Sequence, residues 1–222
     1  MPPKPKPKQA SSKDGTPAPK KIAKAAASRN NSQKNRFRSA YDRGSLPIRI
    51  EHATGGIRLK WTAPSPSEVD VDALLPLFFE GLSLTEHPYN FLAENGAVDL
   101  LRPENSPEVL KVLPYLVQPL RQAMDLSGEK TVAALKILKQ LACLPQCGEA
   151  LVPYYRQLLP PLGRLRDTPT KSYGRPTGHK RNLIGVEELV GDALHALELH
   201  GGPNAYINIK YLLPSYQSAV QL

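Results

Sequence analysis

A proline inside an apolar, aromatic-containing stretch recurs along the chain, and this recurrence constrains the fold more than any other feature. The stretches are LLPLFFEGL (74–82), VLPYLVQPL (112–120) and LVPYYRQLLPPL (151–162). Their leading prolines, Pro76, Pro114 and Pro153, lie 38 and 39 residues apart. A period of about 40 residues is typical of HEAT and armadillo arrays, in which each repeat consists of a few helices.

A fourth stretch, LLPSYQSAV (212–220), places Pro214 61 residues after Pro153, and 41 remain when the 20 polar residues 163–182 are set aside. Proline suits the first position of a helix, because its missing N–H would have no partner there. We therefore expect a helix to start at each leading proline, and Pro119 and Pro160 to bend or delay their helices. The alternative is coincidence among the 23 prolines of the chain.

The pattern of apolar residues divides the chain into three parts. Residues 1–36 contain almost no large apolar side chain, so we expect a disordered tail that orders only on a partner. In residues 37–66, Ile48, Ile50, Ile57, Leu59 and Trp61 alternate with charged residues around a glycine-containing turn, which predicts a β-hairpin with one apolar face. Residues 67–222 show helical periodicity, including a helix over 88–95 that ends at Gly96 and a further turn over 96–101. The expected fold is an all-α, armadillo- or HEAT-like solenoid with a short N-terminal hairpin.

The net positive charge of the chain is confined to its N-terminal part. Residues 1–43 contain 12 Lys and Arg and 2 Asp, a net charge of +10, whereas residues 44–222 have a net charge of −1. Such a tail suits either nucleic acid or an acidic protein surface, above all a polymer that repeats that surface. The absence of aromatic residues from positions 1–36 disfavours single-stranded nucleic acid, whose binders stack bases on aromatic rings.

Motifs for catalysis, cofactors, metals and membranes are not found in the sequence. The chain lacks the phosphate-binding GxxxxGK[ST] loop and the GxGxxG, HExxH and GxSxG patterns. Cys143 and Cys147 are a weak metal signal, since no second pair or neighbouring histidine accompanies them. No apolar run approaches the ~20 residues of a membrane span, and the lysine- and proline-rich N-terminus is not a secretory signal. We expect a protein of the cytosol or nucleus that is not an enzyme and binds no cofactor, metal or membrane.

Five stretches resemble one known family. They are FRSAYDRGSLPIRIEH (37–52), LLPLFFEGL (74–82), ALVPYYRQLLP (150–160), KRNLIGVEELV (180–190) and GGPNAYINIKYLLPSY (201–216). Together they resemble the Parkin co-regulated gene protein family, a group of ciliary and flagellar microtubule proteins, over nearly all of residues 37–222. Two departures are Glu80, where the family pattern has aspartate, and the differing loop 167–179, which puts partner contacts of that loop in doubt.

The resemblance implies an armadillo-like fold and a structural role at the inner junction of axonemal doublet microtubules, where the B-tubule closes onto the A-tubule. It implies contacts with α- and β-tubulin, with a small β-rich flagellar inner-junction protein and with other doublet inner proteins. The candidate partner-binding residues are the basic residues of the tail, the residues that follow it and the terminal motif: Lys20, Lys21, Lys24, Arg29, Arg36, Phe37, Arg38, Tyr41, Arg43, Asn204, Asn208, Lys210 and Tyr211.

Each group of candidates has a structural alternative. Phe37 and Tyr41 suit packing at the edge of the fold equally well, and the asparagines of the terminal motif suit a cap that bonds local backbone. For the whole chain, the alternatives are a cytosolic α-solenoid adaptor that is not built into the doublet and a nucleic-acid-associated scaffold. The expected location is the axoneme of a motile cilium or flagellum, within the cytoskeleton of the cytoplasm.

Overall fold

The computed structural model describes residues 35–53, 56–62, 69–126, 128–167 and 185–218, and this part of the chain is mostly helical. Residues 1–34 of the predicted disordered tail, the turn of the hairpin and most of the polar loop 163–182 lie outside the described residues, whereas Asn35 and Arg36 are already the N-cap and the first residue of the first described helix. The elements are α2 (Arg36–Asp42), β1 (Ile48–Ala53), β2 (Gly56–Trp61), α3 (Val71–Gly81), α4 (Tyr89–Leu100), η2 (Pro103–Asn105), α5 (Ser106–Met124), α6 (Glu129–Cys143), α7 (Cys147–Leu151), η3 (Val152–Tyr154), α8 (Tyr155–Asp167), α9 (Val186–His200) and α10 (Ala205–Leu212).

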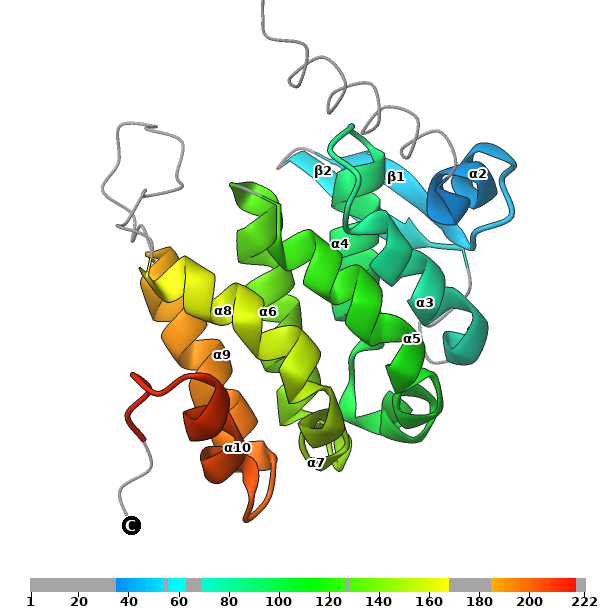
Figure 1. The fold of residues 1–222 in the computed structure, drawn as a ribbon. Coiled ribbons are helices and arrows are strands. Elements are labelled where there is room, and N and C mark those ends of the chain that lie inside the picture. The colour runs from blue at the N-terminus through cyan, green and yellow to red at the C-terminus, as the bar shows by residue number, and fades with distance from the viewer. Residues whose placement is uncertain (1–34, 54–55, 63–68, 127, 168–184, 219–222) are drawn as a thin grey trace, which may run out of the picture. The chain divides into compact units, whose positions relative to one another are not determined.

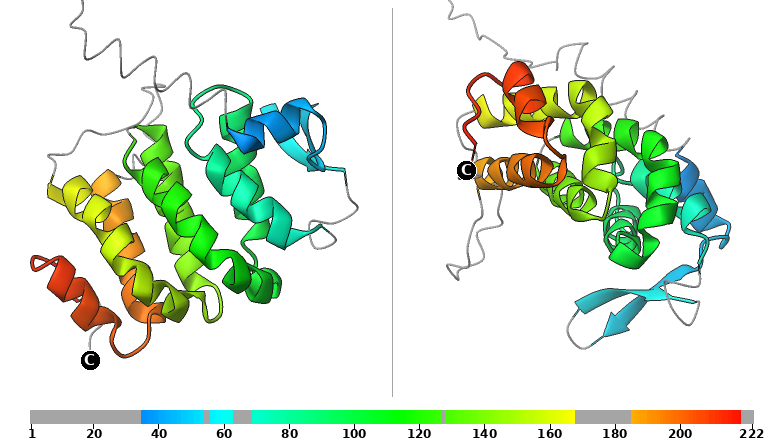
Figure 2. Two further views of the ribbon diagram at one scale, coloured as in Figure 1. Left: turned by 45° about the vertical axis from the view of Figure 1, so that its right-hand side comes forward. Right: turned by 90° about the horizontal axis from the view of Figure 1, so that it is seen from below.

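The helices between residues 71 and 200 pack in a regular succession. Helix α3 packs against α5, and α5 packs against α8; behind them α4 packs against α6, and α6 packs against α9. Each front helix also contacts the helix that follows it in the second row, and α10 closes this succession against α8 and α9. Figures 1 and 2 show the two rows side by side. Each amphipathic helix thus buries its apolar stripe between two or three neighbours.

A continuous apolar core runs between the two rows. Every helix from α2 to α10 contributes at least one fully or almost fully buried side chain. The largest ones come from α2 to α5 and from α8: Phe37, Leu75, Phe78, Phe79, Leu92, Leu100, Leu116, Leu120 and Tyr155.

The predicted β-hairpin is confirmed. Strands β1 and β2 pair antiparallel with Ile48 opposite Trp61 and His52 opposite Ile57. Ile48 is buried, and the Trp61 indole N–H donates to the Asp99 carboxylate of α4 at 2.9 Å. The hairpin therefore lies on the helices at its base, while Ile57 toward its tip is exposed.

The prediction that each leading proline starts a helix holds for Pro153, which lies in the first turn of η3, and is wrong for the other three. Pro76 lies inside α3, Pro114 lies inside α5, Pro153 lies in η3 before α8, and Pro214 follows the end of α10. Helix α3 begins instead at Asp70, whose carboxylate accepts from the Ala73 N–H at 3.1 Å.

Neither Pro119 nor Pro160 delays its helix, since α5 and α8 continue through them. Pro114 and Pro160 are exposed, so the carbonyl that each leaves without an intrahelical donor can bond to water. The prolines spaced 38 and 39 residues apart nevertheless lie in or directly before helices at equivalent positions of the fold, because α3, α5 and α8 contact one another in order.

The predicted helix over 88–95 and the further turn predicted over 96–101 form one unbroken helix, α4, so the predicted stop at Gly96 is wrong. The helix continues to Leu100, and Gly96 lies where α4 crosses the ring of Phe78. A Cβ at position 96 would lie 2.1 Å from Phe78 Cε1, so the glycine allows a close approach of two helices.

Candidate functional site

Helix α2, which with its C-cap residue carries five of the candidate residues, is fixed to α3 by the residue that precedes it. The Asn35 side-chain oxygen accepts from the backbone N–H groups of Phe37 and Arg38 at 3.0 and 3.3 Å. Its amide nitrogen donates to the Glu80 carbonyl at the end of α3 at 2.8 Å. Asn35 therefore caps α2 and also fixes its position on the helical body.

The two aromatic candidates of α2 take part in packing. Phe37 has no exposed surface, and its ring centroid lies 5.3 Å from that of Phe78. Tyr41 is half-buried and meets the ring of Tyr89 edge-on, with 5.9 Å between centroids. Burial therefore supports the packing interpretation for Phe37, whereas Tyr41 keeps part of its surface exposed.

The three arginines of α2 and its C-cap are in different environments. Arg36 is exposed and forms a 3.0 Å ion pair with Glu80. Arg38 is one-quarter exposed, pairs with Glu86 at 2.5 Å and stacks over the ring of Tyr89 at 4.8 Å. Arg43 is exposed and forms no ion pair with the described residues. Arg43 is thus the candidate of this group whose charge is most available to a partner.

Tyr89 connects the aromatic and charged contacts of this region. Its hydroxyl donates to the Asp42 carboxylate at 2.7 Å. That hydrogen bond, together with partial burial and the negative charge of Asp42, raises the pKa of Tyr89. Asp42 also lies 3.8 Å from the Arg38 guanidinium, so helix α2 and the N-terminus of α4 share a small network of charges.

The terminal candidates lie on α10 at the other end of the helical succession. Asn204 occupies the N-cap position without a side-chain cap bond, and the Asn208 side chain donates to the Asn204 carbonyl at 2.9 Å. The Lys210 ammonium donates to the Tyr216 carbonyl at 2.7 Å. Asn208 and Lys210 therefore hold local backbone, as the structural alternative predicts, whereas the side chain of Tyr211 is 77% exposed.

Sequence reasoning missed the apolar residues beside Tyr211. Of the eight large apolar side chains that are exposed in the described part of the chain, three lie on α10: Tyr206, Ile207 and Tyr211. The signal was present, because AYINIKYL carries apolar residues on more than one face of the helix. Exposed apolar side chains that gather in one place mark a contact surface.

The structure does not bring the two candidate groups together. Helix α2 contacts α3 and α4, whereas α10 contacts α8 and α9. Lys20, Lys21, Lys24 and Arg29 lie outside the described residues. The exposed candidate residues thus lie on two separate surfaces, one charged around Arg36 and Arg43 and one apolar on α10.

Two further findings concern other kinds of site. Among residues 35–218, as far as they are described, no three His, Cys, Asp or Glu side chains gather in a way that could hold a metal ion. None of the described helices has the length and apolar composition needed to cross a bilayer. Cys143 is exposed, while burial raises the pKa of the Cys147 thiol to about 11.

Comparison with known proteins agrees with the resemblance seen in the sequence. The model of the family described as Parkin co-regulated protein matches residues 35–218. The match begins at Asn35, the cap of the first described helix. A mouse (Mus musculus) protein, the Parkin coregulated gene protein homolog, is 36% identical over 186 residues, which cover 83% of this chain and 76% of the mouse protein. The chain belongs to the Parkin co-regulated protein family.

Proposed function

We propose that the protein is a structural microtubule-associated protein of the axoneme, which cements the inner junction between the A- and B-tubules of doublet microtubules and so supports ciliary and flagellar motility. Family membership is the observation that carries the proposal, through the role that the resemblance implies. The charge distribution supports it, because a net charge of +10 on residues 1–43, against −1 on residues 44–222, suits attachment to an acidic filament.

In this proposal the body is an armadillo-like stack. The succession of α3, α5 and α8 in front of α4, α6 and α9 supports that description. A stack of this kind buries each unit against its neighbours and presents long outer faces to other proteins. The body works by shape and contact, without catalysis or a cofactor.

The proposed partners are α- and β-tubulin, the small β-rich inner-junction protein and other proteins inside the doublet. Single contacts need not be strong, because a protein that repeats along a filament gains from the high effective concentration of its neighbouring sites. The tail gives an attachment that salt weakens, and Arg36 and Arg43 extend its positive charge onto the folded part.

Co-sedimentation with microtubules tests the attachment step. The deletion should end at Lys34, because Asn35 caps α2 and bonds to α3. We expect the full chain to pellet with microtubules in a salt-sensitive manner, and residues 35–222 to lose most of that binding. Unchanged affinity and unchanged salt dependence after the deletion would contradict the role of the tail.

Two matched controls sharpen the experiment. A chain in which Lys20, Lys21, Lys24 and Arg29 become glutamine keeps the length of the tail and removes four charges, so its binding should fall between those of the other two chains. A chain with the order of residues 1–34 scrambled keeps the charge and separates electrostatics from sequence-specific contacts. Competition with RNA in the same assay tests the nucleic-acid alternative.

The second candidate function is a cytosolic adaptor, which the exposed apolar side chains of α10 favour. The two functions differ in what happens when the protein is removed from a flagellated cell. A junction protein should leave doublets with an open or unstable inner junction and disturbed beating, whereas loss of a cytosolic adaptor should leave the junction closed.

A further inference from the structure

Gly191, in the middle of α9, is a glycine that the described fold does not require. A Cβ at position 191 would meet no atom within 4 Å. The glycines within the other described helices are different: at Gly81, Gly96, Gly148 and Gly163 an added Cβ would lie less than 3 Å from another part of the protein. Close packing explains those four residues and leaves Gly191 without an explanation inside the described structure.

Glycine is unfavourable at such a position. It makes a helix interior less stable than alanine does, because its backbone loses more conformational freedom on folding. Its one structural benefit is a bare backbone, which lets another group approach the helix more closely than any side chain would allow. The open space above Gly191 is therefore where an approaching group would lie.

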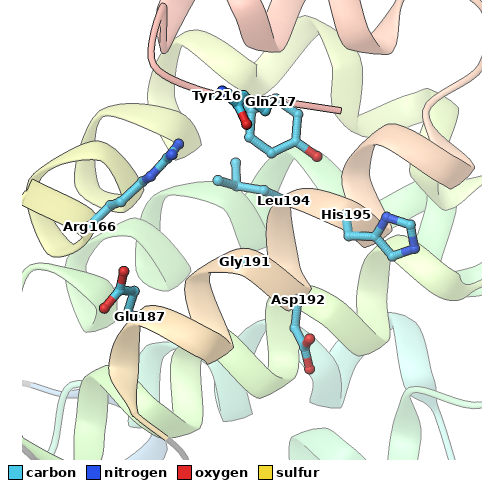
Figure 3. Close-up of a pocket in the computed structure, with 8 residues that line it drawn as sticks. All are labelled: Arg166, Glu187, Gly191, Asp192, Leu194, His195, Tyr216 and Gln217. Atoms are coloured by element: carbon cyan, nitrogen blue, oxygen red, sulfur yellow. The ribbon is translucent and has the colours of Figure 1, made fainter. Parts of the chain in front are cut away.

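That space is part of a cavity of about 460 Å³ between α8, α9 and the segment after α10. Figure 3 shows Gly191 at its floor, with Arg166 on one side, His195 on the other and Tyr216 above. A volume of this size is typical of binding pockets in proteins.

The Tyr216 wall of the cavity is held firmly in place. The ring of Tyr216 is 5% exposed, and its hydroxyl donates to the buried Glu198 carboxylate at 2.7 Å. The Lys210 ammonium and the Arg166 guanidinium donate to the carbonyls of Tyr216 and Ser215 at 2.7 and 3.0 Å. The cavity is therefore formed before any partner arrives, which lowers the cost of binding.

Negative charge at one edge of the cavity indicates the chemistry of its occupant. Glu187 lines the cavity, and Glu188 is the next residue of α9. Both side chains are exposed, and neither forms an ion pair with the described residues. Asp192, on the same helix, pairs with Lys139 at 2.7 Å. Arg166 lies on the same side of the cavity as Glu187 (Figure 3), and its guanidinium already donates to the Ser215 carbonyl. The acidic edge suits a lysine or arginine of the incoming group.

We propose that the cavity over Gly191 is a docking site for a short extended segment of a partner protein, with a small or flat residue against the glycine and a lysine or arginine beside Glu187 and Glu188. This inference does not depend on the filament-binding role. It assigns the body a basic partner, in contrast to the acidic surface proposed for the tail.

The test combines the stability of the full chain with selection of peptides from a phage-displayed library of random nine-residue peptides. In Gly191→Ala, we expect the melting temperature to rise by about 2 °C, since alanine stabilises the helix and fills open space. Peptides selected on the wild-type chain should be enriched in lysine and arginine, and their affinity should fall about tenfold or more for Gly191→Ala because the methyl group occupies their position.

A matched pair of charge variants tests the acidic edge. Glu187→Gln with Glu188→Gln should weaken the selected peptides about threefold to tenfold. Glu129→Gln is the control, because Glu129 occupies the first turn of α6 as those glutamates occupy that of α9, and it should leave the affinity unchanged.

Several results would overturn the proposal. A lower melting temperature of Gly191→Ala would mean that the fold itself needs the glycine. Failure to select any peptide, selection of acidic peptides, or equal binding to wild type and Gly191→Ala would each contradict the docking site. If peptides were selected only after residues 168–184 had been deleted, a segment of this same chain would be the occupant and the partner would be excluded.

Discussion

The two ends of the described fold carry the same kinds of candidate residue in opposite environments. At the α2 end, Phe37 is fully buried and Arg38 is bonded on two sides. At the α10 end, the side chain of Tyr211 is 77% exposed and its neighbour Ile207 is 66% exposed. At the α2 end, Phe37 and Arg38 contact the body of the protein, whereas at the α10 end Ile207 and Tyr211 remain exposed.

Residue type alone therefore does not identify a contact surface. An arginine or an aromatic ring becomes available to a partner only when no neighbour in the fold already engages it. By this criterion Arg43 and Tyr211 are the strongest contact candidates of their respective ends, and Phe37 is the weakest.

The largest expected effect on stability comes from Phe37→Ala. Removing a fully buried ring that packs on Phe78 should lower the free energy of unfolding by about 3–5 kcal/mol. Urea denaturation measures this change, and Phe37→Leu should recover much of it. A loss below about 1 kcal/mol would show that α2 is not part of the core and would remove the contrast between the two ends.

Next in size is the effect of the two asparagines that precede these helices. Asn35→Ala should cost about 1–2 kcal/mol, because the side chain caps α2. Asn204→Ala is the matched control at the N-cap position of α10, where the side chain makes no cap bond, and should cost less than about 0.5 kcal/mol. Equal losses in urea denaturation would contradict the different roles of the two asparagines.

A smaller effect separates Arg38 from Arg43. Arg38→Gln removes an ion pair and a stacked cation, so it should cost about 0.5–1 kcal/mol, less at high salt. Arg43→Gln should leave stability unchanged and weaken microtubule binding in the sedimentation assay. The opposite pattern, in which Arg38→Gln affects binding alone, would reverse the assignment.

The pH dependence of Tyr89→Phe should be smaller still. The hydrogen bond to Asp42 raises the pKa of Tyr89, so the fold favours the protonated hydroxyl. Its contribution, less than about 1 kcal/mol for an exposed bond, is fully present below the unfolded value of about pH 10. It is lost as the pH rises through the higher pKa of the folded state. The stability difference between wild type and Tyr89→Phe should therefore shrink above pH 10, and a difference that grows there would contradict this account.

The smallest change in stability is expected for Tyr211→Ala. Since most of this side chain is exposed, the free energy of unfolding should change by no more than about 0.5 kcal/mol. Binding to isolated doublets or to a junction partner should nevertheless weaken if α10 is a contact surface. If binding in a pull-down is unchanged, Tyr211 contributes neither to stability nor to contact with a partner.

Local patterns in the sequence predicted those parts of the fold that depend on residues close together in the chain. The alternation of Ile48, Ile50, Leu59 and Trp61 with charged residues predicted the hairpin, and apolar periodicity predicted most of the helices. The helix starts were wrong at Pro76 and Pro114, because the cap of α3 lies upstream and both prolines are tolerated inside continuous helices.

The environment of the candidate residues could not be predicted in the same way, because it depends on contacts between distant parts of the chain. The Arg36 and Arg38 guanidinium groups meet Glu80 and Glu86, which lie 44 and 48 residues further along the sequence. The same holds for Gly96, whose need for glycine arises from the ring of Phe78 on another helix. Sequence patterns identified the arginines as candidates, and tertiary packing determines which of the candidates are free to bind a partner.

A cryo-electron microscopy map of doublet microtubules isolated from cells that contain this protein would show whether it occupies the inner junction. We expect density for the helical body of residues 35–218 where the B-tubule closes onto the A-tubule, repeated along the filament and absent after deletion of the gene. An inner junction filled by other chains in wild-type and deletion doublets alike would contradict the proposal.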